Sequence, residues 1–301
     1  MISTFHDNST YTGRWAGEKC EKPICVKDYN MTMAGIDLKD QKLSMNLMER
    51  QRGPRIRKNC VDVASKNDDT LISRIVGGEK TTIEEHPYQV AIRANRDFCG
   101  GFIISNTYIL TAAHCLGKVN ASDLIMRAGS TFRNNGSKIS VAEIIVHPDY
   151  NKKRYDKDIG IIRTTDPISF NKKIHPIPLP RRKRALLPGA EIIISGWGRT
   201  TETADNIPHQ LREVTIQVVN FTLCRKVYGN ILTENMFCAG DYENGGKGSC
   251  RGDSGGAAIQ KELAVGIVSF AKGCARKKTP GVFVDIAAPD IRDFITKQTH
   301  L

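Results

Sequence analysis

The chain has 301 residues, of which 40% are hydrophobic and 25% charged, a composition typical of a soluble globular protein with one large domain or two small ones. Its 44 Lys and Arg outnumber its 32 Asp and Glu, for a formal net charge of +12. No zinc-knuckle spacing or RNA-binding aromatic motif accompanies this charge, so we expect no specific nucleic-acid partner and, at most, contact with a polyanion. No stretch approaches the roughly 18 apolar residues of a membrane span.

The cysteine content indicates an oxidising compartment. Nine cysteines are many for a cytosolic protein, and none forms a C-x-x-C pair. Residues 1–17 lack the apolar core of a signal peptide, so we expect that a leader is missing or that the start of the sequence differs. Glycosylation sequons of the Asn-x-Ser/Thr type also suit a secreted protein, and they begin at Asn8, Asn30, Asn120, Asn135 and Asn220.

Residues 1–74 show little periodicity and predict a mostly irregular pro-segment or linker. Within them, residues 36–48 have loosely helical apolar spacing and predict a short helix. Residues 50–58 are basic and contain Gly53-Pro54, which is typical of a flexible, protease-accessible segment. The composition then changes abruptly at Ser73-Arg74-Ile75-Val76-Gly77-Gly78. An arginine before a branched aliphatic pair and two glycines predicts proteolytic processing after Arg74.

Beyond Arg74, short apolar runs of strand length alternate with Gly-, Asn- and Pro-rich turns, a pattern that predicts an all-β sandwich or barrel. Only the C-terminus predicts a helix, because Ile291, Phe294 and Ile295 form an apolar face after Pro289-Asp290. The clearest strand candidates are residues 102–104, 140–146, 192–195, 214–219, 264–270 and 282–286.

One stretch, residues 248–256, is suited to expose a reactive hydroxyl. It reads Gly-Ser-Cys-Arg-Gly-Asp-Ser-Gly-Gly, and its glycines permit sharp turns and uncovered amide N–H groups. Ser254 would need a base to remove its proton. His114 is the best candidate, because small residues flank it and Cys115 follows, whereas the other histidines lie in Pro-containing turns or near the termini. Taken alone, the stretch also fits a Gly-rich loop with an incidental serine.

Residues 75–301 resemble the trypsin/chymotrypsin-like serine proteases along nearly their whole length, and the resemblance does not extend to residues 1–74. It implies two six-stranded antiparallel β-barrels with a C-terminal helix and an active site in the cleft between the barrels. The matching motifs stand in the family's order: Ile75-Val76-Gly77-Gly78, Thr111-Ala112-Ala113-His114-Cys115, Asp158-Ile159-Gly160-Ile161-Ile162, Ser195-Gly196-Trp197-Gly198, Met236-Phe237-Cys238-Ala239-Gly240 and Gly252-Asp253-Ser254-Gly255-Gly256.

The resemblance assigns the catalytic roles. Ser254 would attack the scissile carbonyl, His114 would accept and later return the proton, and Asp158 would orient the imidazole. The amides of Gly252 and Ser254 would form the oxyanion hole. Asp156 is a neighbouring acid, but the Ile-Gly-Ile-Ile run that follows Asp158 favours Asp158. No metal or organic cofactor is implied.

The resemblance also implies a mode of activation. Cleavage after Arg74 would create an ammonium group on Ile75, and in the family this group inserts beside the aspartate that precedes the nucleophile. Here that aspartate is Asp253. A half-made buried ion pair is costly, so we expect a zymogen whose oxyanion hole is poorly formed until the chain is cut.

The family's disulfide pattern would use all six cysteines that follow Arg74, as Cys99–Cys115, Cys224–Cys238 and Cys250–Cys274. Cys20, Cys25 and Cys60 remain, and their pairing is open. Pro178 occupies the catalytic-domain end of the chymotrypsin-type tether, so we expect the pro-segment to be released after cleavage. A clip-type regulatory domain would need about twice as many cysteines.

The specificity pocket departs from trypsin. Trypsin-like members hold an aspartate six residues before the nucleophile, where this chain has Gly248, and by the same resemblance Ser249, Ser269, Ala271 and Gly281 belong to the pocket. None is charged, and a buried ammonium would lack a counter-ion. We therefore expect an apolar or aromatic P1 side chain, with Leu or Met competing with Phe or Tyr. Relaxed specificity with weak activity is the alternative.

An enzyme with this pocket would not cut after Arg74, so we expect a separate upstream trypsin-like protease to activate it. Ala257 stands where the family usually has proline, which would loosen the loop without removing a catalytic group. Residues 124–142 contain no Asp or Glu, so we expect no calcium at that loop. Residues 181–184 (Arg-Arg-Lys-Arg) predict a solvated basic loop between the barrels, with a proprotein-convertase cut or a heparin contact as alternatives.

Taken together, the sequence predicts a secreted, monomeric serine endopeptidase that acts on protein or peptide substrates. A protease-like protein used for binding or regulation is the competing class. Such proteins usually lose a triad residue, whereas His114, Asp158 and Ser254 are all present.

Overall fold

The computed structural model describes residues 11–15, 18–22, 76–95, 97–117 and 119–301. The chain divides into two units, Met1–Asp69 and Thr70–Leu301. In the first unit, β1 (Tyr11–Trp15) and β2 (Glu18–Lys22) form an antiparallel pair. The helix expected at residues 36–48 lies outside the described residues, as do Arg74 and Ile75.

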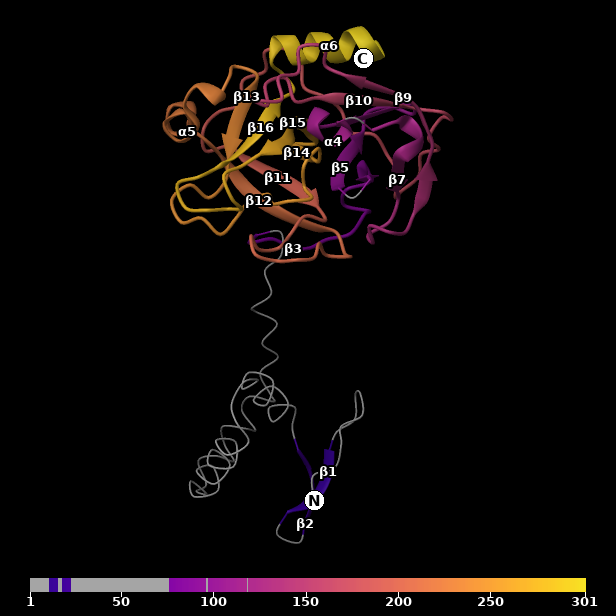
Figure 1. Cartoon of the computed structure of the whole chain (residues 1–301), viewed down its shortest axis with the longest axis vertical. Coiled ribbons are helices and arrows are strands. Elements are labelled where there is room, and N and C mark those ends of the chain that lie inside the picture. The colour runs from indigo at the N-terminus through magenta and orange to yellow at the C-terminus, as the bar shows by residue number, and fades with distance from the viewer. Residues whose placement is uncertain (1–10, 16–17, 23–75, 96, 118) are drawn as a thin grey trace. The chain divides into compact units, whose positions relative to one another are not determined.

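The first half of the second unit folds into one curled antiparallel sheet, drawn in purple and magenta in Figure 1, with the order β8-β7-β4-β5-β6-β10-β9. Only Ser140 separates the two edge strands β8 and β9, so consecutive residues lie on opposite edges and turn the sheet back on itself. The strands are β4 (Gln89–Ala94), β5 (Asp97–Ile103), β6 (Tyr108–Thr111), β7 (Leu124–Ala128), β8 (Ser137–Ile139), β9 (Val141–Val146) and β10 (Gly160–Thr164).

The second half closes into a six-stranded barrel, because β11 pairs with both β14 and β12. The all-β fold with a C-terminal helix is therefore confirmed, although the first half is a curled seven-stranded sheet rather than a closed six-stranded barrel. The barrel strands are β11 (Glu191–Gly196), β12 (Arg212–Val219), β13 (Met236–Ala239), β14 (Ala257–Gln260), β15 (Leu263–Phe270) and β16 (Gly281–Asp285).

Side-chain alternation explains why these runs form strands. In β12, Val214, Ile216 and Val218 are buried, while Thr215 and Gln217 between them are exposed. Successive side chains of a strand point to opposite faces, so this period of two places one face in the barrel core. The six runs predicted as strands overlap β5, β9, β11, β12, β15 and β16.

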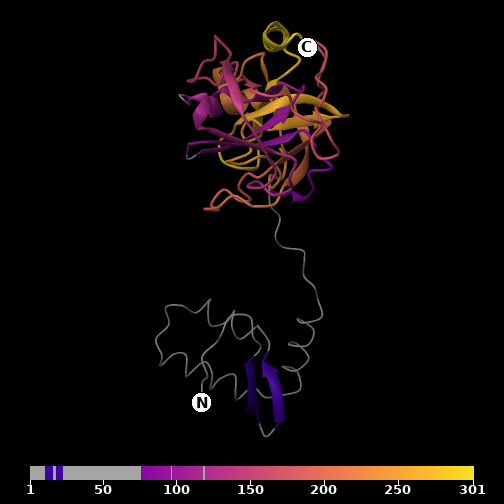
Figure 2. The same cartoon turned by 90° about the vertical axis from the view of Figure 1, so that its right-hand side faces the viewer.

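The short helices lie outside the sheets. They are α4 (Ala113–Leu116), α5 (Phe221–Tyr228) and α6 (Pro289–Thr299), with single 3₁₀ turns η1 (Ala121–Asp123) and η2 (Gly229–Ile231). Figures 1 and 2 both place α6 at one end of this unit. No described helix is long and apolar enough to cross a membrane.

Each end of the second unit packs against the half that lies farther from it in the sequence. The N-terminal strand β3 (Glu79–Lys80) pairs with β12 of the second barrel. The C-terminal helix α6 buries Ile291, Phe294 and Ile295 in the same hydrophobic cluster as Leu116 and Ile161 of the first half. Each half is thus held by a segment from the far end of the chain, which fixes the position of the cleft between them.

Candidate active site

His114 and Asp158 come from adjacent parts of the first half and meet at two points. Asp158 lies at the end of the β9–β10 connection and is fully buried, and His114 lies on α4 directly after β6. The Nδ1 atom of His114 lies 2.7 Å from Oδ2 of Asp158, and the backbone N–H of His114 donates to Oδ1 at 2.8 Å. A carboxylate bound at both oxygens fixes the imidazole orientation and favours a proton on Nδ1.

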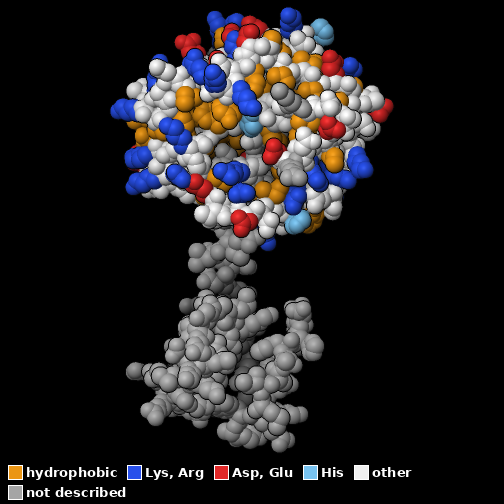
Figure 3. Space-filling view, viewed as in Figure 1, with side chains coloured by type: hydrophobic (Ala, Val, Ile, Leu, Met, Phe, Trp, Pro, Cys, Tyr) orange, Lys and Arg blue, Asp and Glu red, His pale blue; other side chains and the backbone are white. Residues whose placement is uncertain are grey.

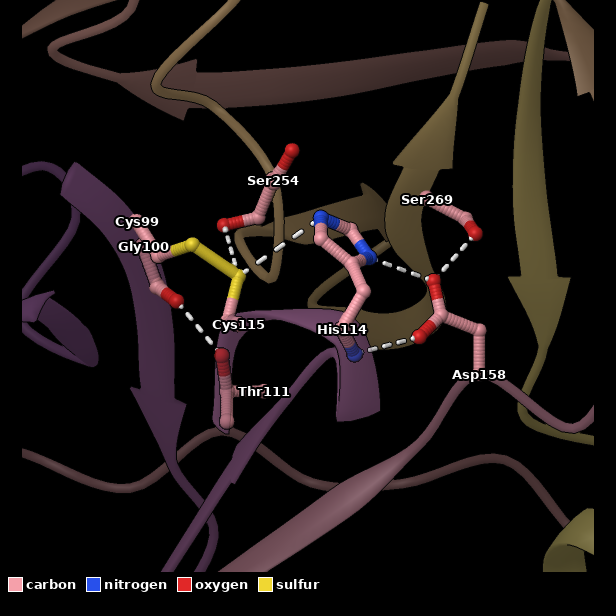
Figure 4. The surroundings of a disulfide bond; sticks show 8 residues. All are labelled: Cys99, Gly100, Thr111, His114, Cys115, Asp158, Ser254 and Ser269. Carbon is pink, nitrogen blue, oxygen red and sulfur yellow. Dashed lines mark hydrogen bonds and ion pairs between the residues drawn. A yellow bond between two sulfur atoms is a disulfide. The ribbon is translucent and has the colours of Figure 1, made fainter. Parts of the chain in front are cut away.

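The second half adds a further contact to the same carboxylate. Ser269 lies on β15, and its hydroxyl donates to Oδ2 of Asp158 at 2.5 Å (Figure 4). The sequence assigned Ser269 to the substrate pocket, whereas the structure turns its side chain toward Asp158. This contact crosses between the two halves, so it ties the orientation of the acid to the barrel that carries the serine loop.

Ser254 lies beside the Nε2 edge of the His114 ring in Figure 4. No described residue forms a hydrogen bond with its hydroxyl, including His114. Catalytic hydrogen bonds are often long before substrate binds, so the arrangement brings together the three predicted residues without a closed Ser254–His114 bond. Asp156, the alternative acid, instead accepts from Thr233 and Asn235.

The backbone around Ser254 is clamped between the two halves. The carbonyl of Ser254 accepts from the N–H of Gly100 on β5 at 2.8 Å, and the N–H of Gly255 donates to Val268 on β15 at 2.8 Å. Gly255 has a φ of 82°, and a Cβ there would lie 2.2 Å from Oγ1 of Thr111. Only glycine fits this conformation and this space, which explains the glycine after the serine.

The two amides predicted to form the oxyanion hole have no acceptor among the described residues. The N–H of Arg199 donates to the carbonyl of Arg251 at 2.7 Å. Because a trans peptide points its C=O and N–H in opposite directions, this bond turns the N–H of Gly252 away from Arg199. Gly252 and Ser254 therefore keep donors that a substrate oxygen could accept.

Asp253 is buried beneath this loop, with 2% of its surface exposed. Its Oδ1 accepts from the N–H of Gly198 at 2.7 Å, and its Oδ2 accepts from the N–H of Cys250 at 3.0 Å. Burial raises the pKa of the Asp253 carboxyl to about 6, an effect that the two N–H donors partly oppose. No described cation contacts this carboxyl. A Cβ on Gly198 would lie 2.2 Å from Oδ2, so only glycine fits beside it.

Four of the five residues predicted for the substrate pocket line one narrow cavity. Gly248, Ser249, Ala271 and Gly281 surround a space of about 10 Å³, roughly the volume one water-sized probe occupies. A Cβ on Gly248 would lie 3.4 Å from the Cβ of Ala275, which therefore faces Gly248. Ala275 was not predicted from the sequence, because it reaches the pocket through a loop between β15 and β16.

Aromatic residues near the triad were also not predicted from the sequence. The rings of His114 and Tyr155 meet edge-on with centroids 5.7 Å apart, and Tyr155 lies 5.0 Å from Phe270. Phe270 in turn meets Tyr228 of α5 edge-on at 5.6 Å. The only sequence signal for them is that Tyr155 lies near Asp158 and that Phe270 follows Ser269.

Among the described residues, disulfides join Cys99 to Cys115, Cys224 to Cys238 and Cys250 to Cys274, the pairs that the resemblance implied. Cys99, His114 and Cys115 also form a cluster of potential metal ligands. The two sulfurs are bonded to each other, and a disulfide offers no thiolate to a metal ion. We therefore do not interpret this cluster as a metal site. Its disulfide instead links β5 to the helix that carries His114.

Comparison with known proteins gives a consistent result. A sequence profile of the family described as "Trypsin" matches residues 75–295. The chain is 38% identical over 232 residues to a trypsin of Phaedon cochleariae, covering 75% of this chain and 89% of that protein. It is 38% identical over 228 residues to the anionic trypsin of Canis lupus familiaris, covering 74% and 89%. It is 37% identical over 217 residues to trypsin Blo t 3 of Blomia tropicalis, covering 70% and 82%.

Proposed function

Because this chain belongs to the trypsin family of serine proteases and is a serine-type endopeptidase, we propose that Ser254, His114 and Asp158 form its catalytic triad. The observation that carries the proposal is the two-point contact of Asp158 with His114, with Ser254 beside the opposite nitrogen of the same ring.

The proposed reaction uses each group at a stated atom. The hydroxyl oxygen of Ser254 attacks the scissile carbonyl while its proton passes to Nε2 of His114. Asp158 stabilises the imidazolium through Nδ1–H, and the N–H groups of Gly252 and Ser254 bind the oxyanion. His114 then protonates the leaving amine as the C–N bond breaks. Water, deprotonated by His114, hydrolyses the acyl-enzyme and restores Ser254.

A serine-reactive phosphonate tests the triad. The chain cut after Arg74 should be labelled once, at Ser254, and Ser254→Ala should remain unlabelled. Ser249→Ala, which changes a serine of the neighbouring pocket, is the matched control and should still be labelled. Labelling of Ser254→Ala, or of a different serine in the parent chain, would contradict the assignment.

We further propose that the enzyme is secreted as a zymogen, with residues 1–74 as its pro-segment. Asp253 supports the activation step, because its buried carboxyl has no described cationic partner and its pKa is raised. The three disulfides support an oxidising compartment. An upstream trypsin-like protease would cut after Arg74, so purified zymogen should not activate itself. Autoactivation in the absence of any other protease would contradict this.

We also propose that the enzyme prefers substrates with an apolar side chain at P1. Gly248, Ala271 and Gly281 bring no charge to the cavity. Three charged residues also line it, Asp241, Lys247 and Arg276. The carboxylate of Asp241 accepts hydrogen bonds from Asn244, and Arg276 pairs with Glu202. Peptide-library profiling should show apolar P1 residues ahead of Lys and Arg. Gly248→Asp should raise kcat/KM for Lys and Arg by about tenfold or more, because it supplies a buried counter-ion. Equal cleavage at all P1 residues would instead indicate relaxed specificity.

A further inference from the structure

A group of exposed cations borders the catalytic cleft on one side. They come from three segments: the β9–β10 connection, α5, and the loop after β15. Figure 3 shows Lys and Arg gathered over the part of the molecule where Figure 1 places α5 and the neighbouring loops. We call this group the basic rim, and it comprises Lys152, Lys153, Arg154, Arg225, Lys226 and Lys272, all exposed.

The segments that carry the rim are poor in acidic residues, although Asp156 and the exposed Glu234 flank them. Residues 151–154, 221–232 and 271–278 contain no Asp or Glu. Two of the rim cations donate to backbone carbonyls, which carry no formal charge: Arg154 donates to the carbonyl of Asn230 at 2.6 Å, and Lys272 donates to the carbonyl of Val227 at 2.8 Å. Just beyond the rim the pattern differs, because Arg276 pairs with Glu202 and Lys278 with Glu243. The rim is therefore a local excess of positive charge.

The rim is held in place by contacts between its segments. The Arg154–Asn230 bond joins the β9–β10 connection to η2, directly after α5, and together with Arg225 these residues border a surface hollow of about 570 Å³. Asp156 anchors the same connection by accepting from Thr233 and Asn235. Charges on fixed segments lose little side-chain or loop freedom when they bind a partner.

A continuous path of rings leads from the triad to the rim. It runs from His114 to Tyr155, Phe270 and Tyr228, with centroid separations of 5.7, 5.0 and 5.6 Å. The ammonium of Lys272 lies 5.2 Å from the centroid of the Tyr228 ring. Tyr155 and Phe270 are half-buried, whereas Tyr228 is buried. A peptide bound at Ser254 could therefore pass over Tyr155 and Phe270 and place its next side chains at the rim.

The chemistry decides which half of the substrate faces the rim. The leaving amine is released beside Nε2 of His114, and this nitrogen lies 3.8 Å from Sγ of Cys115. The pocket proposed for the P1 side chain, which belongs to the acyl half, is lined by Ala271, and Ala271 lies between Phe270 and the rim residue Lys272 on one segment. The acyl half, which is the part of the substrate N-terminal to the scissile bond, is then the half that runs toward the cations.

We propose that the basic rim selects protein substrates with acidic residues on the N-terminal side of the scissile bond. This inference rests on the proposed triad, since it concerns the substrate of the same site. The carboxylates would attract the substrate during encounter and then pair with the exposed cations. A sulfated glycan would meet the same charges, but the aromatic path from His114 to Lys272 favours a peptide that is already bound for cleavage.

The test compares matched peptides with the full chain cut after Arg74. One peptide carries three Asp or Glu residues N-terminal to the cleaved bond, one carries the same residues C-terminal to it, and one carries Asn or Gln. At low ionic strength the first should be cleaved with a kcat/KM roughly tenfold above that of the neutral peptide, as expected for a few exposed ion pairs. The advantage should largely disappear at about 0.5 M salt.

Two charge-matched variants assign the effect to the rim. Lys152→Glu combined with Arg225→Glu should abolish or reverse the preference for the first peptide. Lys138→Glu combined with Lys261→Glu changes the net charge equally, but alters exposed residues of β8 and of the β14–β15 turn, and it should retain the preference. The fraction labelled by the phosphonate measures active sites in every sample, so a failed triad is distinguished from a failed preference.

Three results would overturn the proposal while leaving the labelled serine intact: equal cleavage of acidic and neutral peptides, preference for acids C-terminal to the bond, or equal loss in both double variants. If a sulfated oligosaccharide bound the rim while acidic peptides were cleaved no faster than neutral ones, the surface would be a glycan site and the proposal would be wrong.

Discussion

The two halves of the peptidase unit differ in whether their active-site groups already have their partners. The first half supplies His114 and Asp158, which are already joined at 2.7 and 2.8 Å. The second half supplies Ser254 on a loop whose buried neighbour Asp253 has a raised pKa and no described cationic partner. The His114–Asp158 geometry is therefore present in the uncut chain, whereas under the zymogen proposal the loop that carries Ser254 gains an ammonium group beside Asp253 only after cleavage.

The largest effect should come from breaking the completed half. In the cut chain, Asp158→Asn should lower kcat by about 10⁴-fold, because an amide no longer favours the Nδ1–H tautomer of His114. Thermal unfolding should show that the variant remains folded, and steady-state kinetics measures the loss. A decrease of less than tenfold would mean that Asp158 does not orient the catalytic histidine.

Cleavage after Arg74 should increase activity through the second half, which carries Ser254. Uncut Arg74→Gln protein should hydrolyse peptides at least 10²- to 10³-fold more slowly than the cut parent, about the effect of losing one oxyanion donor. Arg57→Gln, which removes a basic residue upstream, is the control and should still be activated. Comparable rates for Arg74→Gln and the cut parent would show that the serine loop needs no activation.

The pH dependence of stability should separate the cut and uncut chains. Burial raises the pKa of Asp253 in the folded chain to about 6, above the ordinary value of an aspartate carboxyl, so the folded uncut chain binds the proton more tightly than the unfolded chain. Its stability should therefore fall as pH rises from about 4 to 6, by on the order of 3 kcal/mol from this group. In the cut chain an ammonium beside Asp253 should remove most of this loss.

Urea unfolding of Arg74→Gln and of the cut parent, measured across that pH range, gives the two curves. The free energy of unfolding of the cut chain should rise relative to that of the uncut chain between pH 4 and 6. Parallel curves would show that Asp253 gains no cationic partner on cleavage.

The smallest effect concerns the contact that crosses between the halves. Ser269→Ala should lower kcat about tenfold, because it removes one charge-assisted hydrogen bond from Asp158. Ser195→Ala is a matched control: it removes the buried hydrogen bond from Ser195 to Gln89 without touching the triad. It should cost about 1 kcal/mol of stability and leave kcat nearly unchanged. Equal kcat losses in both variants would indicate a general packing defect.

The sequence was sufficient to predict features that depend on residues close together in the chain. The alternation in β12 and the apolar face of α6 identify elements from neighbouring residues, and the glycines around Ser254 mark the loop. Features that depend on distant segments could not be read in this way. The sequence does not show that Ser269 turns toward Asp158, or that Arg154 meets Asn230, because these contacts join residues 111 and 76 positions apart. They follow from the closure of the barrel and from its packing against the first half.

The packing of the C-terminal helix against the first half affects how the protein can fold during synthesis. The hydrophobic cluster that contains the core of the first half also includes residues of β14–β16 and α6, which are among the last to be translated. Domains commonly fold in order as they leave the ribosome, but here the cluster is complete only when the C-terminus has been made. The two halves should therefore become stable together, after synthesis ends, and a chain that stops before residue 289 should be recognised as unfinished by chaperones and proteases.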